Sequence, residues 1–271
     1  MKIIRDQGVT FFPRVIALGT FDGVHRGHQK LIEAGRELSG LLGAALRVVT
    51  FDRHPLEVLR PEKAPPLIMT TLQKARRLAL LGVDEMQMIP FSRERADQEP
   101  EAFLEELRSD VNLRGIVAGW NYTFGKDGRG TAETLIRDGK AHGYEVRIIP
   151  PVTTQEGKII SSSAIRKALL SGYVQEATLL LGGFPEYVGT ALTDSELGQE
   201  VFRLESRLLP PDGVYFAGLS DRAENRFSPR KVRLVRGLLI PEKAACPLPP
   251  AGKRIRIRLM AGENHPAKQK K

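Results

Sequence analysis

The amino-acid sequence predicts an α/β fold in two parts, a doubly wound parallel sheet followed by a small β-barrel-like domain. Short apolar runs of β type alternate with amphipathic stretches of helical length through the first two thirds of the chain. Strands separated by such helices form βαβ units and therefore a parallel sheet. Beyond Phe184-Pro185 the pattern changes to short β-like pieces separated by Pro and Gly, which is typical of a small barrel or sheet.

Each element of the first part is predicted by one of these stretches. The predicted strands are Val15–Leu18, Leu46–Thr50, Glu85–Ile89, Gly115–Ala118 and Val146–Ile149. The predicted helices are Gln29–Leu42, Thr71–Leu81, Pro100–Arg108, Thr131–Gly139, a helix reaching about Leu170, and Val174–Leu181.

The second part contains four predicted β pieces, Tyr187–Leu192, Gly213–Gly218, Lys231–Ile240 and Arg254–Leu259. We therefore expect a catalytic domain over residues 1–184, a β domain over residues 185–260 and a basic tail over residues 261–271.

The composition is that of a soluble globular protein, with 41% hydrophobic and 27% charged residues in a chain of 271. A single cysteine, Cys246, excludes an internal disulfide and suits a reducing cytoplasm. No signal peptide or membrane-spanning stretch is visible. The net charge of +9 is dispersed with little aromatic interleaving, which favours the steering of small anions over binding to nucleic acid.

The most informative segment is Gly19-Thr-Phe-Asp-Gly-Val-His-Arg-Gly-His28, directly after the first predicted strand. Two imidazoles three residues apart on a first helical turn share one face, and the free N–H groups at a helix start suit phosphate. Gly27 would allow close approach to the backbone. Paired histidines can also be surface residues or metal ligands, and neither a P-loop nor a dinucleotide fingerprint is present. We interpret the segment as a nucleotide phosphate site.

Three further segments follow predicted strands or open a helix. His54 and Pro55 end one strand, although such a histidine can be an ordinary loop residue. Residues 119–125 carry an amide and three aromatic side chains, which could line a planar ligand or belong to the core. Residues 160–166 offer serines, which often serve as N-caps, and an arginine that could hold a polyphosphate.

Taken together, GTFDGVHRGH (19–28), TFDRHP (50–55), GWNYTFG (119–125) and ISSSAIR (160–166) resemble the bacterial bifunctional riboflavin kinase/FAD synthetase family. The resemblance covers residues 14–183. The HxGH motif alone marks the wider nucleotidyltransferase superfamily, and the other segments specify FAD synthetase. The resemblance implies FMN adenylyltransferase activity, in which AMP passes from ATP to FMN with Mg²⁺ and gives FAD and pyrophosphate.

The resemblance also implies roles for individual residues. It implies that His25, His28, His54 and Asn121 are catalytic. The residues that it implies for ATP binding are Gly19, Phe21, Asp22, Gly27, Ser162, Ser163 and Arg166. Those that it implies for flavin binding are Phe124 and Leu59. No metal ligand is assigned, and Asp22 and Asp52 are both candidates for Mg²⁺.

The family's kinase half carries a Leu-Gly-Phe-Pro-Thr-Ala-Asn-Leu segment, and here the chain departs from it. Leu197-Gly-Gln-Glu-Val-Phe-Arg-Leu204 stands in register, so Val201 and Arg203 replace the Thr and Asn that serve the kinase's ATP and Mg²⁺. The segment with the catalytic glutamate has no counterpart. We therefore expect a relic barrel without riboflavin kinase activity. Alternatives are a nucleotidyltransferase for another phosphorylated acceptor, or a non-catalytic flavin- or nucleotide-binding protein.

Overall fold

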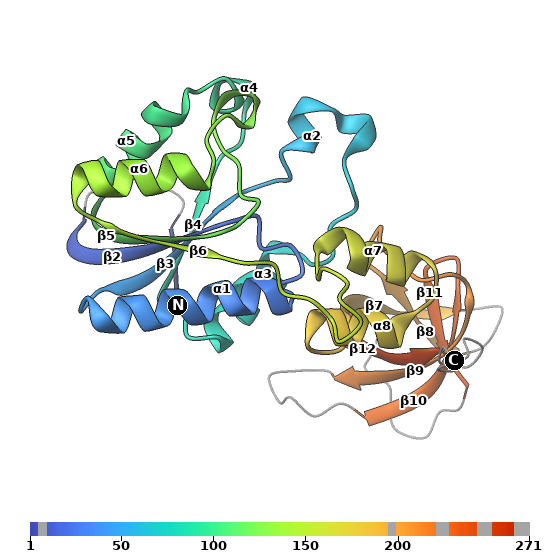
Figure 1. Ribbon diagram of the computed structural model, residues 1–271. Coiled ribbons are helices and arrows are strands. Elements are labelled where there is room, and N and C mark those ends of the chain that lie inside the picture. Colours follow the sequence, from blue (N-terminus) through green and yellow to red (C-terminus); the bar gives the residue numbers. More distant parts are fainter. Residues whose placement is uncertain (5–9, 195–198, 221–227, 243–250, 263–271) are drawn as a thin grey trace. The chain divides into compact units, whose positions relative to one another are not determined.

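The computed structural model (Figure 1) describes residues 1–4, 10–194, 199–220, 228–242 and 251–262. The chain divides into two compact units. The first contains Met1–Pro65 and Thr70–Ile160, and the second contains Pro66–Met69 and Ser161–Lys271.

A six-stranded sheet forms the centre of the first unit, and all of its strand pairs are parallel. The order across the sheet is β1-β4-β3-β2-β5-β6. The strands are β1 (Lys2–Ile4), β2 (Thr10–Leu18), β3 (Ala45–Phe51), β4 (Glu85–Ile89), β5 (Val111–Gly119) and β6 (Glu145–Ile149). From β2 the chain builds outward to β3 and β4, then crosses to the other side of β2 for β5 and β6. This confirms the predicted doubly wound sheet, and such reversals are where ligands bind.

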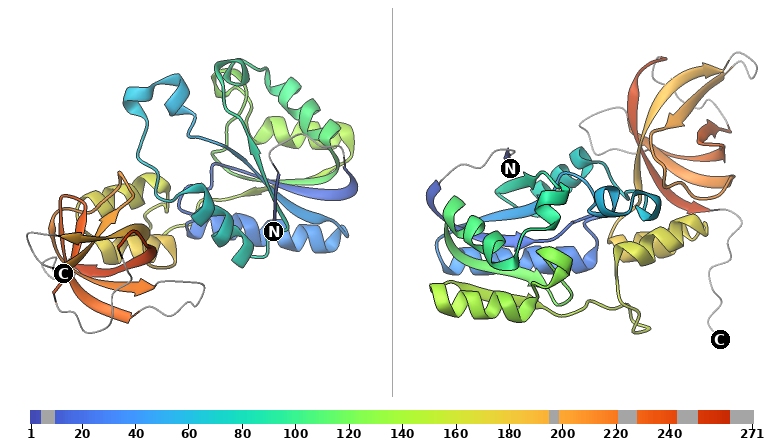
Figure 2. Two further views of the ribbon diagram at one scale, coloured as in Figure 1. Left: turned by 180° about the vertical axis from the view of Figure 1, so that it is seen from behind. Right: turned by 90° about the horizontal axis from the view of Figure 1, so that it is seen from above.

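Helices cover both faces of this sheet. Figures 1 and 2 show α1 and α3 on one face and α5 and α6 on the other. The helices of the unit are α1 (Arg26–Leu41), α2 (Leu56–Leu59), α3 (Thr71–Leu80), α4 (Arg93–Ala96), α5 (Pro100–Asp110) and α6 (Ala132–His142), with short 3₁₀ turns η1 (Pro61–Lys63) and η2 (Lys126–Gly128).

Helix α1 packs very closely on the sheet. Its buried face carries Leu31, Ile32 and Leu38, spaced as expected for one side of a helix. At Gly35 an added Cβ would lie only 2.8 Å from Cδ1 of Leu46 on β3, so a larger residue would push the helix away. The first turn of α1, which carries the paired histidines, is therefore held at a defined height above the strand ends.

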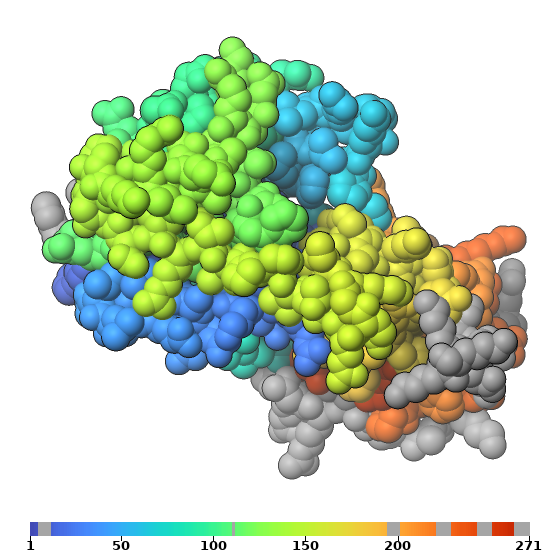
Figure 3. Space-filling view, in the orientation of Figure 1, coloured from blue at the N-terminus to red at the C-terminus, as the bar shows by residue number. Residues whose placement is uncertain are grey.

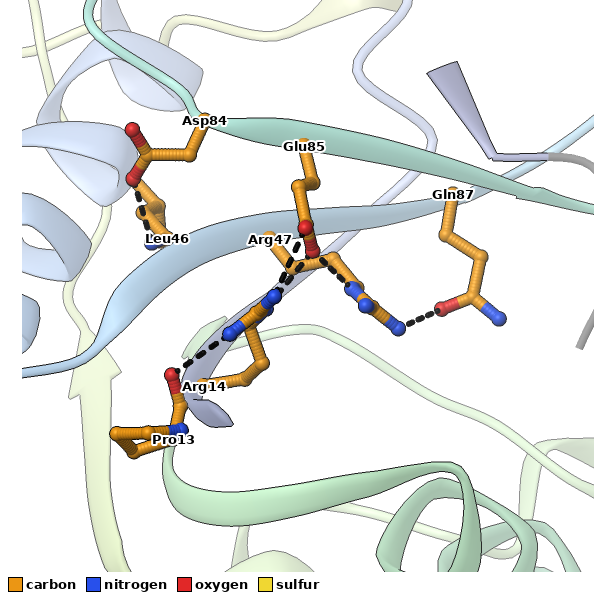
Figure 4. Close-up of polar contacts among 7 residues, drawn as sticks. All are labelled: Pro13, Arg14, Leu46, Arg47, Asp84, Glu85 and Gln87. Atoms are coloured by element: carbon orange, nitrogen blue, oxygen red, sulfur yellow. Dashed lines mark hydrogen bonds and ion pairs between the residues drawn. The ribbon is translucent and has the colours of Figure 1, made fainter. Parts of the chain in front are cut away.

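A charged cluster joins three neighbouring strands (Figure 4). Arg14 of β2 donates from Nε and Nη2 to the two carboxylate oxygens of Glu85, at 2.8 and 2.9 Å. Arg47 of β3 donates from Nε to Glu85 at 2.8 Å and from Nη1 to the side-chain oxygen of Gln87 at 3.2 Å. Arg14, Arg47 and Gln87 are buried. Burial alone would raise the pKa of Glu85, but the two guanidinium groups lower it.

The second unit contains two helices, α7 (Ser162–Leu170) and α8 (Val174–Leu181), and a closed antiparallel barrel. Its strand order is β10-β11-β8-β7-β12-β9. The strands are β7 (Glu186–Asp194), β8 (Gln199–Leu204), β9 (Gly213–Ser220), β10 (Ser228–Val235), β11 (Leu238–Pro241) and β12 (Arg254–Gly262). Phe202, Tyr215 and Ile257 lie in the barrel core, together with Val174 of α8. The predicted β-barrel-like part is confirmed.

Several details differ from the sequence prediction. The predicted single piece Lys231–Ile240 is two strands, β10 and β11, joined by a tight turn in which Arg236 and Gly237 have φ of 47° and 79°. Arginine gives no turn signal, and here Asp212 helps to hold the turn by accepting a hydrogen bond from the Arg236 N–H at 2.8 Å. Strands β1 and β8 and the short helices α2 and α4 were not predicted.

The compact units group α7 and α8 with the barrel, whereas the sequence-based domain limit lies at residue 184. That limit follows the family's functional segments and stays a prediction. Cys246, Leu197 and Gly198 lie outside the described residues, as does most of the predicted basic tail. Over the described ranges, no helix is long and apolar enough to cross a membrane.

Replacement of Glu85 by Gln should destabilise the first unit by about 3–5 kcal/mol, because two buried guanidinium groups lose their counter-charge. Urea unfolding followed by tryptophan fluorescence measures this loss. The chain's single tryptophan, Trp120, lies in the first unit and reports on it.

Glu33→Gln is the matched control, because it breaks an exposed ion pair with Lys30 and should cost less than about 1 kcal/mol. The pKa of Glu85 is lower in the folded protein than its ordinary value of 4.5. The stabilisation that Glu85 gives to the folded state should therefore be complete above pH 4.5, and it should be lost as the pH falls through the lowered pKa. Equal losses in the two variants would contradict a structural role for the cluster.

Candidate active site

The chain leaves β2 through a strained turn at the reversal point of the sheet. Phe21 and Val24 have φ of 51° and 40°, in the left-handed region, and Gly23 has φ of 87°. Non-glycine residues rarely adopt this conformation. The surroundings impose it here, because Phe21 and Val24 are fully buried and the Val24 N–H donates to the Phe21 carbonyl at 3.2 Å. Strain of this kind gathers at functional sites.

His25 and His28 stand at the start of α1, directly after this turn. His25 is the N-cap, and its Nδ1 accepts a hydrogen bond from the backbone N–H of His28 at 3.3 Å. The two rings stack with centroids 3.7 Å apart and planes inclined by 17°. The Phe21 ring lies 5.1 Å from the His28 ring. The predicted shared face of the two imidazoles is therefore present as a stacked pair.

Gly27 lets the His25 ring lie close to the backbone, because it has no side chain. A Cβ at this position would lie 3.1 Å from Cε1 of His25 and 3.6 Å from the carbonyl oxygen of Ile160. Only glycine leaves the His25 ring undisturbed at this distance. Gly19, at the start of the turn, is similarly close to the Phe21 ring, at 3.1 Å.

The electrostatics of the site favour a bound anion. The pKa of His28 is lowered well below 6.5, first by burial and then by repulsion from His25 and Lys74. Its Nδ1 is buried, and no hydrogen-bond partner is found for it in the described part of the chain. Lys74 donates from Nζ to the Thr20 carbonyl at 2.7 Å. The site thus combines a neutral imidazole, an ammonium group and a helix N-terminus, an arrangement suited to phosphate.

His54 and Asp52 lie in the loop after β3. Nδ1 of His54 accepts a hydrogen bond from the Leu56 N–H at 3.1 Å, so this nitrogen holds the start of α2. Asp52 accepts from the Phe91 N–H at 3.0 Å and pairs with Arg53. Burial raises the pKa of Asp52, but these bonds lower it overall.

A cavity of about 300 Å³ opens beside these loops. Four phenylalanines gather around it and are joined by ring contacts: Phe51 with Phe91 at 4.8 Å, and Phe103 with Phe124 at 5.5 Å. Leu59 of α2 also lines it. Figure 3 shows the atoms around α2, in cyan, beside those of the segments that follow β4 and β5. Flat aromatic walls suit a planar ligand.

The loop after β5 follows the strand next to β2 and carries residues that line this cavity. Phe124 is buried in the core and also lines the cavity, and its contact with a flavin stays a prediction. Asn121 is exposed at the tip. A larger hollow of about 850 Å³ runs along α1, but none of the predicted site residues lines it.

The serine–arginine segment opens α7 in the second unit. The N-cap is Ser161, whose Oγ accepts from the Ala164 N–H at 3.2 Å, so Ser162 and Ser163 occupy the first turn. Arg166 is buried, and its Nε donates to the Pro66 carbonyl at 2.8 Å. This bond ties α7 to the segment Pro66–Met69 within the second unit. Phosphate binding by these residues stays a prediction.

Comparison with known proteins identifies the family. A family model described as FAD synthetase matches residues 11–164. The chain belongs to the FAD synthetase family. The match covers more than half of the chain, and it includes both histidines and the loop after β5.

Individual relatives agree with this assignment. A bifunctional riboflavin kinase/FMN adenylyltransferase of Listeria monocytogenes is 35% identical over 212 residues, and one of Bacillus subtilis is 36% identical over the same length. Each alignment covers 74% of this chain and 66% of the relative, so the chain spans just under two thirds of these relatives. A second Listeria monocytogenes protein, named FAD synthetase, is 32% identical over 203 residues. This alignment covers 74% of this chain and 79% of that relative.

A solved structure has the same fold over the whole chain. The crystal structure titled macrolide-efflux protein from Streptococcus pneumoniae superposes with a TM-score of 0.83 at 26% identity, covering 100% of this chain and 92% of that one.

The carboxylates of this family member limit how Mg²⁺ could be held. Within the described ranges, no group of three or more His, Cys, Asp or Glu side chains gathers as a metal site. Asp52 is engaged by Phe91 and Arg53, while Asp22 lies buried in the histidine turn. A single carboxylate fits a magnesium ion carried mainly by nucleotide phosphates and water.

Lys74 lies beside the histidine turn, and the sequence analysis did not single it out. Its helix was predicted, but a lysine in an amphipathic helix gives no functional signal by itself. The aromatic walls Phe51, Phe91 and Phe103 were missed as well, since they come together only through the packing of β3, the loop after β4 and α5.

We predict that Gly27→Ala weakens nucleotide binding by about tenfold while the stability of the first unit changes by less than about 1 kcal/mol. The added methyl group forces the His25 ring to move by a few tenths of an ångström, which spoils the alignment that a phosphate needs. Titration with ATP and urea unfolding measure the two quantities. Gly40→Ala, in open space on the same helix, should leave ATP binding unchanged.

His28 should titrate below the ordinary histidine value of 6.5 in the free protein. The pKa of His28 is lower in the folded protein than in the unfolded chain. Its contribution to the free energy of unfolding is therefore present above the unfolded pKa, and it is lost as the pH falls through the folded pKa. Proton NMR of the ring measures the midpoint, with His28→Asn for assignment. A midpoint at or above 6.5 would show that the burial and repulsion described here do not act on this ring.

Proposed function

We propose that this chain is an FMN adenylyltransferase, which transfers AMP from ATP to FMN and releases pyrophosphate. The observation that carries the proposal is the stacked His25–His28 pair at the N-terminus of α1, located at the reversal point of a parallel sheet. The neighbouring aromatic cavity suits a flat acceptor. The family membership supports the same reaction.

In the proposed reaction a phosphate oxygen of FMN attacks the α-phosphorus of ATP. The new P–O bond forms as the bond from the α-phosphorus to the bridging oxygen breaks, and that oxygen leaves with pyrophosphate. FMN supplies an anionic nucleophile, so the protein needs no covalent intermediate. Its task is to align the two phosphates and offset their charge.

The residues have separate parts in this task. The ATP phosphates bind to His25, His28 and the N–H groups of the first turn of α1. The same groups stabilise the negative charge that develops on the leaving pyrophosphate. Gly19, Phe21 and Gly27 shape the turn that brings the nucleotide to these groups.

The remaining predicted residues complete the proposal. His54 and Asn121 stand in loops that follow β3 and β5, where they can orient the reacting phosphates. Phe124 and Leu59 hold the flavin in the aromatic cavity. Ser162, Ser163 and Arg166 bind ATP, a role that rests on the family resemblance.

Magnesium would neutralise phosphate charge when bound with ATP. Asp22 is the residue of the histidine turn that would hold it, directly or through water. The cytoplasm is the compartment we propose for the enzyme, with ATP and FMN as its small-molecule partners and neither nucleic acid nor membrane among them.

We also propose that the barrel has no riboflavin kinase activity. Phe202 and Leu204 belong to the barrel core, so Val201 and Arg203 lie on the other face of β8. On this face a buried aliphatic side chain and an exposed guanidinium group stand where the family motif has a hydroxyl and an amide. Neither replacement can ligate Mg²⁺.

Purified chain supplied with ATP, Mg²⁺ and FMN should form FAD, whereas riboflavin with ATP should give no FMN. Chromatography of the flavins measures both reactions. His28→Ala should lower the rate of FAD formation by about 10²–10³-fold, as expected for loss of one group that stabilises transition-state charge.

His142→Ala is the matched control, since His142 is an exposed histidine of α6, and it should keep the full rate. Absence of FAD formation by the unaltered chain would contradict the adenylyltransferase proposal. Formation of FMN from riboflavin would contradict only the second proposal, on the barrel.

A further inference from the structure

Lys74 projects from the first turn of α3, and this turn is firmly held. Thr70 and Gln73 form a capping box: the Gln73 N–H donates to the Thr70 hydroxyl at 3.3 Å, and the Thr70 N–H donates to the Gln73 side chain at 2.7 Å. The backbone N–H of Lys74 donates to the Thr70 carbonyl at 2.9 Å. The side chain therefore starts from a fixed position.

The ammonium group of Lys74 reaches the turn that carries the histidines. Its Nζ donates to the carbonyl of Thr20 at 2.7 Å, across 54 positions of sequence. The same carbonyl accepts from the Thr50 hydroxyl at 3.0 Å. Thr20 directly precedes Phe21, the first residue in the left-handed conformation. Two separate elements thus anchor the strained turn at one oxygen atom.

The charge of Lys74 also acts on the site. Repulsion from Lys74 and from His25 adds to burial in lowering the pKa of His28. Burial lowers the pKa of Lys74 itself, and the carboxylate of Asp22 opposes this effect. Over the described residues the ammonium makes no hydrogen bond besides that to Thr20, so two of its three N–H groups stay available to an anion.

We propose that Lys74 is a positioning residue of the adenylyl-transfer site, which anchors the histidine turn through Thr20 and supplies a fixed positive charge beside His28 for the nucleotide phosphates. This inference rests on the proposed function and extends it to a residue outside the family motifs named above. A lysine that only anchored the turn would act through its hydrogen bond and not through its charge.

Three substitutions separate the bond from the charge. Lys74→Arg keeps both, Lys74→Gln keeps a donor for the Thr20 carbonyl without the charge, and Lys74→Met removes both. Lys30→Met is the matched control, because Lys30 is an exposed lysine of α1 paired with Glu33. The FAD-forming assay gives KM for ATP, KM for FMN and kcat, and ring NMR gives the His28 titration midpoint.

We expect the Gln and Met variants to raise KM for ATP by about tenfold, the loss expected for one charge-assisted contact, while KM for FMN stays within about twofold. The His28 midpoint should rise in both, because a repelling charge has gone. Lys74→Arg and Lys30→Met should match the unaltered chain in both measurements. Should Lys74→Met fail to fold, the comparison of Gln with Arg decides the question.

Unaltered ATP affinity and an unaltered His28 midpoint in the Gln variant would overturn the proposal and leave Lys74 as an anchor of the turn. Equal losses in the Arg and Gln variants would overturn it as well, since they would show that charge is not the property that matters. If the unaltered chain formed no FAD, the adenylyltransferase proposal would fail. Direct titration with ATP and the His28 midpoint would still test the role of Lys74.

Discussion

The turn between β2 and α1 is the constraint on which the candidate site depends. Phe21 and Val24 adopt left-handed backbone conformations there, which cost free energy and persist only where the surroundings impose them. Burial of both side chains and the bonds to the Thr20 carbonyl impose them here. The turn places His25 as the N-cap of α1, and the two imidazoles stack against each other directly after it.

Stability and chemistry are placed at opposite ends of the same sheet. The cluster of Arg14, Arg47 and Glu85 joins the middle of β2 to the amino ends of β3 and β4 and ties three strands together. The histidine turn and the aromatic cavity follow the carboxyl ends of the strands. Parallel sheets separate these roles because loops at the carboxyl ends converge at the reversal point, so the site can be strained while the other end of the sheet holds the fold.

The barrel is closed and has its own apolar core, although we propose that it has no riboflavin kinase activity. Inward residues of β7, β8, β9 and β12 still build a continuous apolar core, and this core depends on the alternation of side chains along each strand. Of the two motif positions on the other face of β8, Arg203 is exposed, whereas the Val201 side chain is buried. A replacement at the exposed position 203 can therefore remove a ligand for a cation without disturbing the packing that closes the barrel.

Much of this protein was already determined by local sequence. The alternation of apolar runs and helical stretches predicted the parallel sheet, and the change of pattern after Pro185 predicted the barrel, because each pattern depends on neighbouring residues only. Motifs predicted roles for the histidines, Asn121, Phe124 and the serine–arginine segment. Lys74, the aromatic walls and the hairpin turn at Arg236 were decided by tertiary structure. Each depends on residues far apart in the chain, such as Lys74 with Thr20 or Arg236 with Asp212, and no local pattern records such contacts.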